Sequence, residues 1–507
     1  MINNLYNKVK KMVQFFVFMG ILLFLFCKVT WIFRANNSEA RETIQGFHNL
    51  DNIDVVLYGG SNLLRYYQPL EAYKEKGYTS YNYATSAATA DLLKVYIEES
   101  RTSNEAILYV CDVRTMPLLG ETIEETSLRN WSDSVTVFSI QRIKGITSFL
   151  FTRDWEGWDI PSFYFDIAKY HSEYGLLASS DQWSYMKAGS VYDVDKGFAP
   201  NTSANAVPFN EPIVIEERGE LTEQQANTLN ELLDYCDDEN LQVLFIVCPY
   251  IITESDWKIL NKCGDIIQSR GYDFINFNNY YDEIGLDFET DFVDKNHVNY
   301  LGSEKYTEYL MNYISDHYDL PDHRGDKAYS NWDDDYNEYT LQQASWKEEI
   351  VSLVNQHLAA KELGGNLSNI NDFSSWFEAI QDSNFTIIVE KNQCKEYDTD
   401  NFAFHYMIDK WGIDVEQANY VGVWNGEEKL FSNNGEGGYK GIIGVGGGRA
   451  QVQCIVNAGE APVISVNGID YFNNSGGIQI VVFDNNYRKV VDCVNITVDD
   501  NEVNLVR

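Results

Sequence analysis

Short apolar runs alternate with amphipathic segments between about residues 51 and 317. Five of these runs have the length of buried strands, namely 55–58, 80–83, 106–110, 242–247 and 273–277. Helix-like segments lie between them, and the one from 222 begins with Thr222 and Gln225, a capping-box pair. Alternation of this kind is typical of a parallel sheet covered by helices.

The aromatic stretch between 115 and 215 interrupts the alternation. Within it, residues 159–171 read as a helix placed over the functional edge of the sheet, ending at His171. A histidine on an aromatic helical stripe is more often a core residue than a catalyst, so His171 is given no role.

An apolar run covers residues 12–33 and is long enough to cross a bilayer as a helix. Its only charge is Lys28, and Lys8, Lys10 and Lys11 precede it. The positive-inside rule then places the N-terminus in the cytoplasm and everything after about Arg34 outside. No small-residue cleavage signal follows the run, so we expect a single-pass anchor in the cell membrane.

The last 140 residues show a different pattern. Six short β-like runs are separated by turn residues, at 385–390, 419–424, 450–456, 462–466, 478–484 and 488–496. One helix is expected near 401–410. The glycine-rich segment 438–450 precedes no helix and lacks a Gly-Lys-Ser/Thr motif, which favours a hairpin connection over a phosphate site.

These patterns divide the chain into four parts. Residues 1–35 form a cytoplasmic stub and the membrane anchor, and residues 36–340 form the α/β domain. Residues 341–365 form a helical linker. Residues 366–507 form a smaller β-rich α+β domain.

Composition and charge narrow the classes of function. The chain is 44% hydrophobic, which is enough for sizeable cores. Its 76 acidic and 38 basic residues give a net charge of −38, which argues against nucleic acid or an anionic lipid surface as the main partner.

The eight cysteines do not indicate a metal centre. None forms a C-x-x-C motif, so we expect no zinc, other metal or cofactor. Cys111 and Cys248 lie in strand-like apolar runs and are expected in the core. An extracytoplasmic location leaves room for one disulfide among Cys394, Cys454 and Cys493, without selecting the pair.

Candidate chemistry begins at Ser61. The strand 55–58 is broken by Gly59 and Gly60, and a helical pattern starts just after Ser61. A serine on such a turn exposes its hydroxyl beside converging backbone N–H groups, as an acyl-transferring nucleophile requires.

A second candidate lies at the far end of the same domain. Asp294 precedes His297 by three residues on a loop just before a helix. His297 is therefore predicted to act as the base for Ser61, with Asp294 fixing its tautomer.

A serine in the first block and a D-x-x-H motif at the end of the domain resemble the SGNH (GDSL-like) hydrolase superfamily. Over residues 50–340 the chain is most similar to its membrane-anchored, DltD-like branch. The resemblance implies a three-layer α/β/α, flavodoxin-like parallel sheet. It also implies ester chemistry on a cell-envelope polysaccharide or teichoic-acid-like polymer, with a membrane-bound O-acyltransferase as a possible partner.

The oxyanion hole departs from the family pattern. Ala87 stands where the second block has glycine, and its N–H remains a potential donor. The third block's asparagine is missing after the strand, where the chain reads Cys111-Asp112-Val113-Arg114. Asn82, Asn62 or Arg114 would then have to supply that donor.

The C-terminal layout resembles the interleukin-like EMT inducer (ILEI) domain, which implies a glycan-binding or packing accessory. Two functions are carried forward from the sequence. The first is a serine esterase or O-acyltransferase using Ser61, His297 and Asp294. The alternative is a non-catalytic glycan-binding or assembly protein that keeps the fold.

Overall fold

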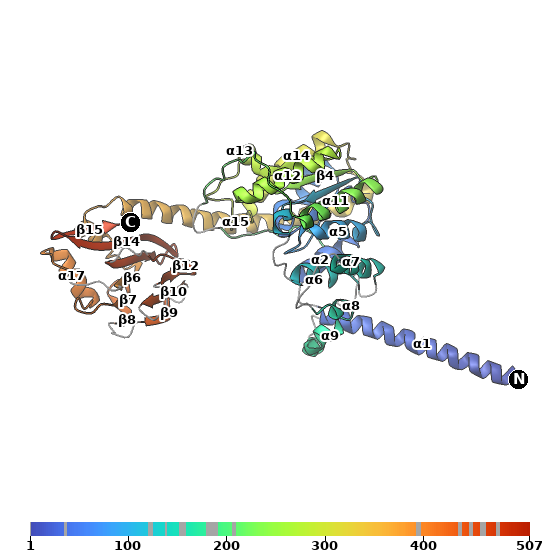
Figure 1. Ribbon diagram of the computed structural model, residues 1–507, viewed down its shortest axis with the longest axis horizontal. Coiled ribbons are helices and arrows are strands. Elements are labelled where there is room, and N and C mark those ends of the chain that lie inside the picture. The colour runs from blue at the N-terminus through green and yellow to red at the C-terminus, as the bar shows by residue number, and fades with distance from the viewer. Residues whose placement is uncertain are drawn as a thin grey trace. The chain divides into compact units, whose positions relative to one another are not determined.

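The computed structural model (Figure 1) divides the chain into two compact units, residues 1–350 and 351–507. Each unit is described by itself. The residues that the structure describes are 2–34, 38–119, 125–136, 139–151, 159–178, 191–204, 209–391, 397–433, 439–445, 450–456, 463–472 and 477–507.

Unit 1 begins with helix α1 (Ile2–Phe33). Within the described residues it is the one helix long and apolar enough to cross a membrane, over Lys8–Phe33. Large apolar side chains from Val9 to Phe26 are exposed along it, whereas Trp31, Ile32 and Phe33 are buried in protein.

A five-stranded parallel sheet forms the centre of unit 1, in the order β2-β1-β3-β4-β5. Its strands are β1 (Val55–Gly59), β2 (Ser80–Ala84), β3 (Leu108–Asp112), β4 (Val243–Val247) and β5 (Asp273–Asn276). The predicted parallel α/β sheet is thus confirmed. β3 begins two residues later than predicted, because its pairing with β1 starts at Leu108 opposite Val55.

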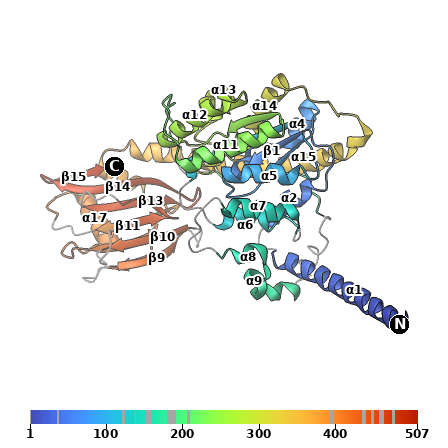
Figure 2. The same ribbon diagram turned by 45° about the vertical axis from the view of Figure 1, so that its right-hand side comes forward.

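Helices cover both faces of this sheet (Figure 2), because side chains alternate along each strand. On β1, Val56 and Tyr58 face one core, and Val55 and Leu57 face the other. The first core is closed by α2 (Ser38–Phe47), α5 (Leu93–Ser100), α11 (Glu223–Asp238) and α12 (Glu254–Ser269). The second is closed by α3 (Ser61–Tyr66), α4 (Pro69–Lys76), α13 (Tyr281–Ile284) and α14 (Tyr300–His317).

A helical excursion follows β3 and returns at α11. It contains η2 (Met116–Leu118), α6 (Glu125–Ser132), α7 (Ile140–Phe151), α8 (Pro161–Tyr164), α9 (Ile167–Tyr170) and η3 (His171–Ala178). The single helix predicted over 159–171 is therefore wrong. The chain breaks at Phe165, and α9 and η3 pack against α1 instead of lying over the sheet.

The short helices η1 (Ala90–Leu92), η4 (Phe277–Asn279) and η5 (Lys327–Tyr329) complete unit 1. A 39-residue helix, α15 (Ser330–Ser368), contains the predicted linker helix and the boundary between the two units. Its first part is joined to unit 1 by a buried ion pair between Lys196 and Asp335.

Unit 2 contains two antiparallel sheets, ordered β15-β14-β13-β6-β7-β8 and β12-β11-β10-β9. Its strands are β6 (Phe385–Lys391), β7 (Tyr420–Asn425), β8 (Glu428–Asn433), β9 (Tyr439–Val445), β10 (Ala450–Val456), β11 (Val463–Val466), β12 (Ile469–Asp470), β13 (Ile478–Asp484), β14 (Lys489–Asp499) and β15 (Glu502–Val506). Helices α16 (Phe373–Ala379) and α17 (Phe402–Trp411) pack on the larger sheet. The β-rich character predicted for this part of the chain is confirmed.

The glycine-rich segment 438–450 contains β9, which pairs antiparallel with β10, so the connection predicted over the whole segment is wrong for residues 439–445. Residues 446–449, between the two strands, lie outside the described residues. Cys454 and Cys493 both carry free thiols, and Cys394 also falls outside the described residues. Cys111 and Cys248 are buried in unit 1, as predicted.

Candidate active site

Two glycines bring Ser61 to the carboxyl edge of the sheet. β1 ends at Gly59, and α3 begins at Ser61. A Cβ atom on Gly60 would lie 3.1 Å from the carbonyl oxygen of Ala88. A Cβ atom on Gly59 would lie 2.9 Å from the side chain of Leu63. The turn is therefore too tight for larger residues, and it lies beside β3, where the strand order reverses direction.

A short closed loop positions His297. The Val293 N–H donates to the carbonyl oxygen of His297 at 2.9 Å, and Phe292 and Val298 form an isolated β-bridge. The Asn299 side chain caps the following helix α14 by accepting from two of its first N–H groups. Cap and bridge hold both ends of the loop.

The structure brings together the three residues predicted as a triad. The Ser61 Oγ lies 2.7 Å from the His297 Nε2, across 236 residues of sequence. The His297 Nδ1 lies 3.0 Å from both carboxylate oxygens of Asp294. With its proton on Nδ1 donated to Asp294, the imidazole presents an accepting Nε2 to the serine hydroxyl.

Asp294 is held in its charged form. Partial burial raises the pKa of its carboxyl, but hydrogen bonds from the His297 ring and from the N–H groups of Asn296 and His297 oppose this. The net result is a pKa below the ordinary range of aspartate. An ionised carboxylate can stabilise an imidazolium at His297.

Arg114 links the serine helix to the histidine loop. Its Nη1 donates to the Asn62 Oδ1 and its Nη2 to the Asn296 Oδ1, both at 2.7 Å. The guanidinium lies over the ring of Tyr250, 4.2 Å from its centroid. The Asn62 amide in turn donates to the carbonyl oxygen of Asn296 at 2.6 Å. These contacts fix the spacing between Ser61 and His297.

The buried carboxylate of Asp112 shapes the turn that carries Arg114. It accepts from the N–H groups of Arg114 at 3.0 Å and Cys248 at 3.3 Å. Burial raises its pKa, and the nearby Arg114 opposes that rise. Asp112 therefore has a structural role at the edge of the sheet, where its carboxylate holds the backbone of Arg114 in place.

The four predicted oxyanion donors fall in different places. Ala87, Asn62 and Arg114 line one cavity with Ser61 and His297. Ala87 is exposed and has a left-handed backbone (φ 62°), and its N–H donates to no group within the described residues. Asn82 is a correction to the prediction. Its buried amide donates to the carbonyl oxygens of Leu63 and Tyr67, behind α3, so it has no donor for this cavity.

The cavity has a volume of about 370 Å³. Its further lining residues include Ser127 from α6 and Asp256 from α12. Sequence reasoning missed both, because no motif ties these helices to Ser61. It also missed Asn296, although this residue lies inside the D-x-x-H motif, and Tyr66, whose hydroxyl contacts the Asn296 carbonyl at 2.9 Å.

Comparison of the chain with protein-family models, with curated proteins and with solved structures finds no match. The fold and site define an α/β unit with a serine, a histidine and an aspartate in hydrogen-bonded series at the carboxyl edge of a parallel sheet.

Proposed function

We propose that the chain is a membrane-anchored serine esterase or O-acyltransferase of the SGNH, DltD-like type. The observation that carries this proposal is the continuous series from the Ser61 Oγ to the His297 Nε2 and from the His297 Nδ1 to Asp294. Both contacts have hydrogen-bond length, and the accepting nitrogen faces the hydroxyl that has to lose its proton.

In the first half-reaction the Ser61 Oγ attacks the ester carbonyl carbon, and its proton moves to the His297 Nε2. Asp294 stabilises the resulting imidazolium. The N–H groups of Ala87 and Ser61 are the proposed donors to the oxyanion, with Arg114 close by. Collapse of the tetrahedral intermediate releases the alcohol, which takes the proton from His297 and leaves an acyl-Ser61.

In the second half-reaction the acceptor hydroxyl gives its proton to His297 and attacks the acyl-Ser61 carbonyl. Water as acceptor releases a carboxylic acid, and a sugar hydroxyl gives a new ester. Ser61 regains its proton from His297 in either case. The acceptor that reaches the cavity decides between the two outcomes.

The proposed substrate is a cell-envelope polysaccharide or a teichoic-acid-like polymer, outside the membrane that α1 crosses. A membrane-bound O-acyltransferase is a candidate donor of the acyl group. Unit 2 is proposed as an ILEI-like accessory that binds glycan or packs on its neighbours. In this orientation, protease added to intact cells digests the chain after Arg34, and protection of that region would contradict the proposal.

A fluorophosphonate tests the proposal directly, because it labels activated serines. The protein should be modified at Ser61 and should hydrolyse small acyl esters. Ser61→Ala should abolish both, while Ser86→Ala should abolish neither, since the Ser86 hydroxyl donates to Glu39 and does not line the cavity. Labelling or turnover that survives Ser61→Ala excludes this triad. A folded chain that is never labelled would favour the non-catalytic glycan-binding alternative.

A further inference from the structure

The outer end of α1 enters protein over a short distance. Side chains from Lys8 to Phe26 are exposed, and Cys27, Lys28 and Val29 are half-buried. The side chains from Thr30 to Arg34 are buried, with Trp31 only 3% exposed. This end packs against α9 and η3 of the helical excursion, and the guanidinium of Arg41 in α2 lies over the Trp31 ring, 4.3 Å from its centroid.

A buried ionic network joins this end of α1 to the excursion. Arg34 forms an ion pair with Asp166 and donates to the carbonyl oxygen of Val135 at 2.9 Å. Arg142 donates to the other oxygen of Asp166 at 2.8 Å. The side chains of Arg34, Asp166 and Arg142 are at most 1% exposed.

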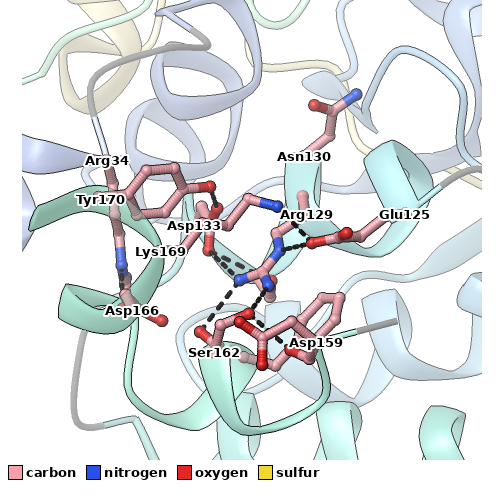
Figure 3. A network of polar contacts seen from close by, with 12 residues as sticks. Arg34, Glu125, Arg129, Asn130, Asp133, Asp159, Ser162, Asp166, Lys169 and Tyr170 are labelled. Atoms are coloured by element: carbon pink, nitrogen blue, oxygen red, sulfur yellow. Dashed lines mark hydrogen bonds and ion pairs between the residues drawn. The ribbon is translucent and has the colours of Figure 1, made fainter. Parts of the chain in front are cut away.

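Such a network is rigid. A buried ion pair is tolerated only when its geometry is maintained, because the loss of one partner leaves an uncompensated charge in a nonpolar environment. Figure 3 shows Arg34 reaching Asp166, and Tyr170 and Arg129 gathered around Asp133. The junction between α1 and the excursion is therefore fixed.

The length of α1 sets the height of this junction relative to a bilayer. Residues 12–31 span about 30 Å as a helix, which matches the hydrocarbon thickness of a membrane. With Lys8, Lys10 and Lys11 at one boundary, the other falls near Trp31. The protein contact along α1 from Cys27 to Arg34 covers about 10 Å, so α9 and η3 lie at the level of the lipid headgroups.

The same short helices carry two exposed aromatic residues. Phe165, between α8 and α9, is 67% exposed, and Tyr174 in η3 is 73% exposed. Aromatic rings are enriched at the boundary between hydrocarbon and water, where an apolar body and a polar tip are both satisfied.

We propose that residues 159–175 dock in the headgroup layer of the bilayer that α1 crosses, with Phe165 and Tyr174 inserted between lipids. Insertion of rings requires no attraction to anionic lipid, in keeping with the net charge of −38. This inference rests on α1 being a membrane helix and is independent of the proposed chemistry at Ser61.

The docked segment is also connected to the candidate active site. Lys169 of α9 pairs with Glu125 of α6 at 2.6 Å, and the Tyr170 hydroxyl donates to Asp133 just after α6. α6 supplies Ser127 to the wall of the cavity. Docking would therefore hold the cavity at a fixed height above the membrane.

The test uses the full chain inserted in phosphatidylcholine vesicles that carry a headgroup spin label. A fluorescent amino acid replaces Phe165 or Tyr174 and, as a control, Ser269. Ser269 is exposed at the end of α12, which lies on the opposite side of unit 1 from α8 and α9 in both views (Figures 1 and 2). The probes at 165 and 174 should lose about half of their fluorescence, and the probe at 269 should lose none.

Two results would overturn the proposal. One is that the probes at 165 and 174 remain as unquenched as the probe at 269 while α1 is inserted. The other is that quenching appears only when anionic lipid is added, because the contact would then be electrostatic.

A pair of variants tests the junction itself. Asp166→Asn should lower the quenching at 165 at least about twofold by loosening the excursion from α1. Lys169→Gln should leave it unchanged, because Lys169 bonds to Glu125 and not to α1. Circular dichroism checks that both variants keep their helices. Undiminished quenching in Asp166→Asn would contradict a junction fixed by this network.

Discussion

The two units of the chain bury their polar side chains in different ways. In unit 1, Ser61, Arg114 and His297 follow different elements and meet at one edge of a parallel sheet. In unit 2, the described core between the two sheets is formed mostly by apolar side chains on antiparallel strands, with the buried carboxyl of Glu390 close to Cys454. A buried carboxyl of that unit, Asp492, is bonded to Trp376 and Arg507 and serves packing.

The difference follows from strand direction. Parallel strands need long crossovers, so loops from distant parts of the sequence gather at their carboxyl ends. Antiparallel neighbours need only short turns, and alternation sends polar side chains outward. We therefore expect chemistry in unit 1 and recognition or packing in unit 2.

The largest expected effect is on the base of the triad. His297→Ala should reduce acyl transfer by about 10⁴-fold, because residues that act as a unit lose most of their activity together. Asp294→Asn should also be strongly impaired while keeping more of the rate. His317→Ala, an exposed histidine bonded to the Tyr313 carbonyl, is the matched control and should leave steady-state ester kinetics unchanged.

The pH profile adds a check on the same pair. Because the pKa of Asp294 lies below its ordinary range, this carboxyl stays charged in weakly acid solution. Asp294 should therefore cause no loss of rate above about pH 4. A loss of rate above that pH that disappears in Asp294→Asn, or full activity in His297→Ala, would contradict the triad and with it the contrast between the units.

The sequence was sufficient to predict the five strands of the parallel sheet, six strands of unit 2 and the residues Ser61, His297 and Asp294 that the structure brings together, but β8, β9, β12 and β15 were not predicted. The strands are recognisable because their apolar runs are short and separated by turn residues. The triad residues are recognisable because Ser61 and His297 each occupy a loop at the end of a predicted element. Both signals can be found in short stretches of sequence. In a parallel sheet the carboxyl ends of the strands lie at one edge, so residues that follow different strands come close together.

The errors came from contacts between distant residues. The helix predicted over 159–171 breaks at Phe165, next to Asp166, which is bonded to Arg34 some 132 residues away. Asn82 was expected at the oxyanion, but its amide caps carbonyl groups at the end of α3. No spacing rule in the sequence reveals which face of a buried strand an asparagine occupies.

Within unit 2, the largest effect on stability is expected at Glu390. It lies on β6, is 1% exposed, and its carboxyl oxygens have no hydrogen-bond partner among the described residues. Burial, with a smaller effect of Asp470, raises its pKa to about 9. The Glu390 carboxyl loses its proton near pH 4.5 in the unfolded chain and near pH 9 in the folded chain. The free energy of unfolding is therefore highest below pH 4.5 and falls as the pH rises towards 9.

Glu390→Gln cannot ionise and should escape this loss. Its stability relative to the parent should increase by about 1.4 kcal/mol per pH unit between pH 5 and 8, in urea unfolding of residues 351–507. Glu428→Gln, an exposed residue on β8, should show no such trend. If the stability of Glu390→Gln relative to the parent does not change with pH, the Glu390 carboxyl is charged and paired in the folded chain. Unit 2 would then hold buried charges in pairs, as unit 1 does.

A substitution of Arg114 tests whether its hydrogen bonds keep the serine helix and the histidine loop at the spacing that the reaction requires. Arg114→Ala removes the two hydrogen bonds that bridge Asn62 and Asn296 and leaves the direct bond from the Asn62 amide to the Asn296 carbonyl. A small displacement of reacting groups is costly. We expect kcat to fall by about 10²-fold with little change in KM. Arg270→Ala, an exposed arginine paired with Asp234 and Asp237, should be neutral. A rise in KM alone would instead make Arg114 a substrate ligand.

The smallest effect is expected at Ala87, where the two units share a feature, since left-handed non-glycine residues also occur in unit 2 at Asn467 and Arg488. A left-handed alanine costs on the order of 1 kcal/mol of backbone strain, which glycine removes. Part of this gain is offset, because glycine also raises the backbone entropy of the unfolded chain. Ala87→Gly should therefore raise the melting temperature of unit 1 by about 2 °C or less. Ester turnover should stay within about twofold, because the N–H proposed to bind the oxyanion keeps its place. A large loss of turnover without a change in melting temperature would show that the methyl group, rather than the N–H, is what the cavity requires at this position.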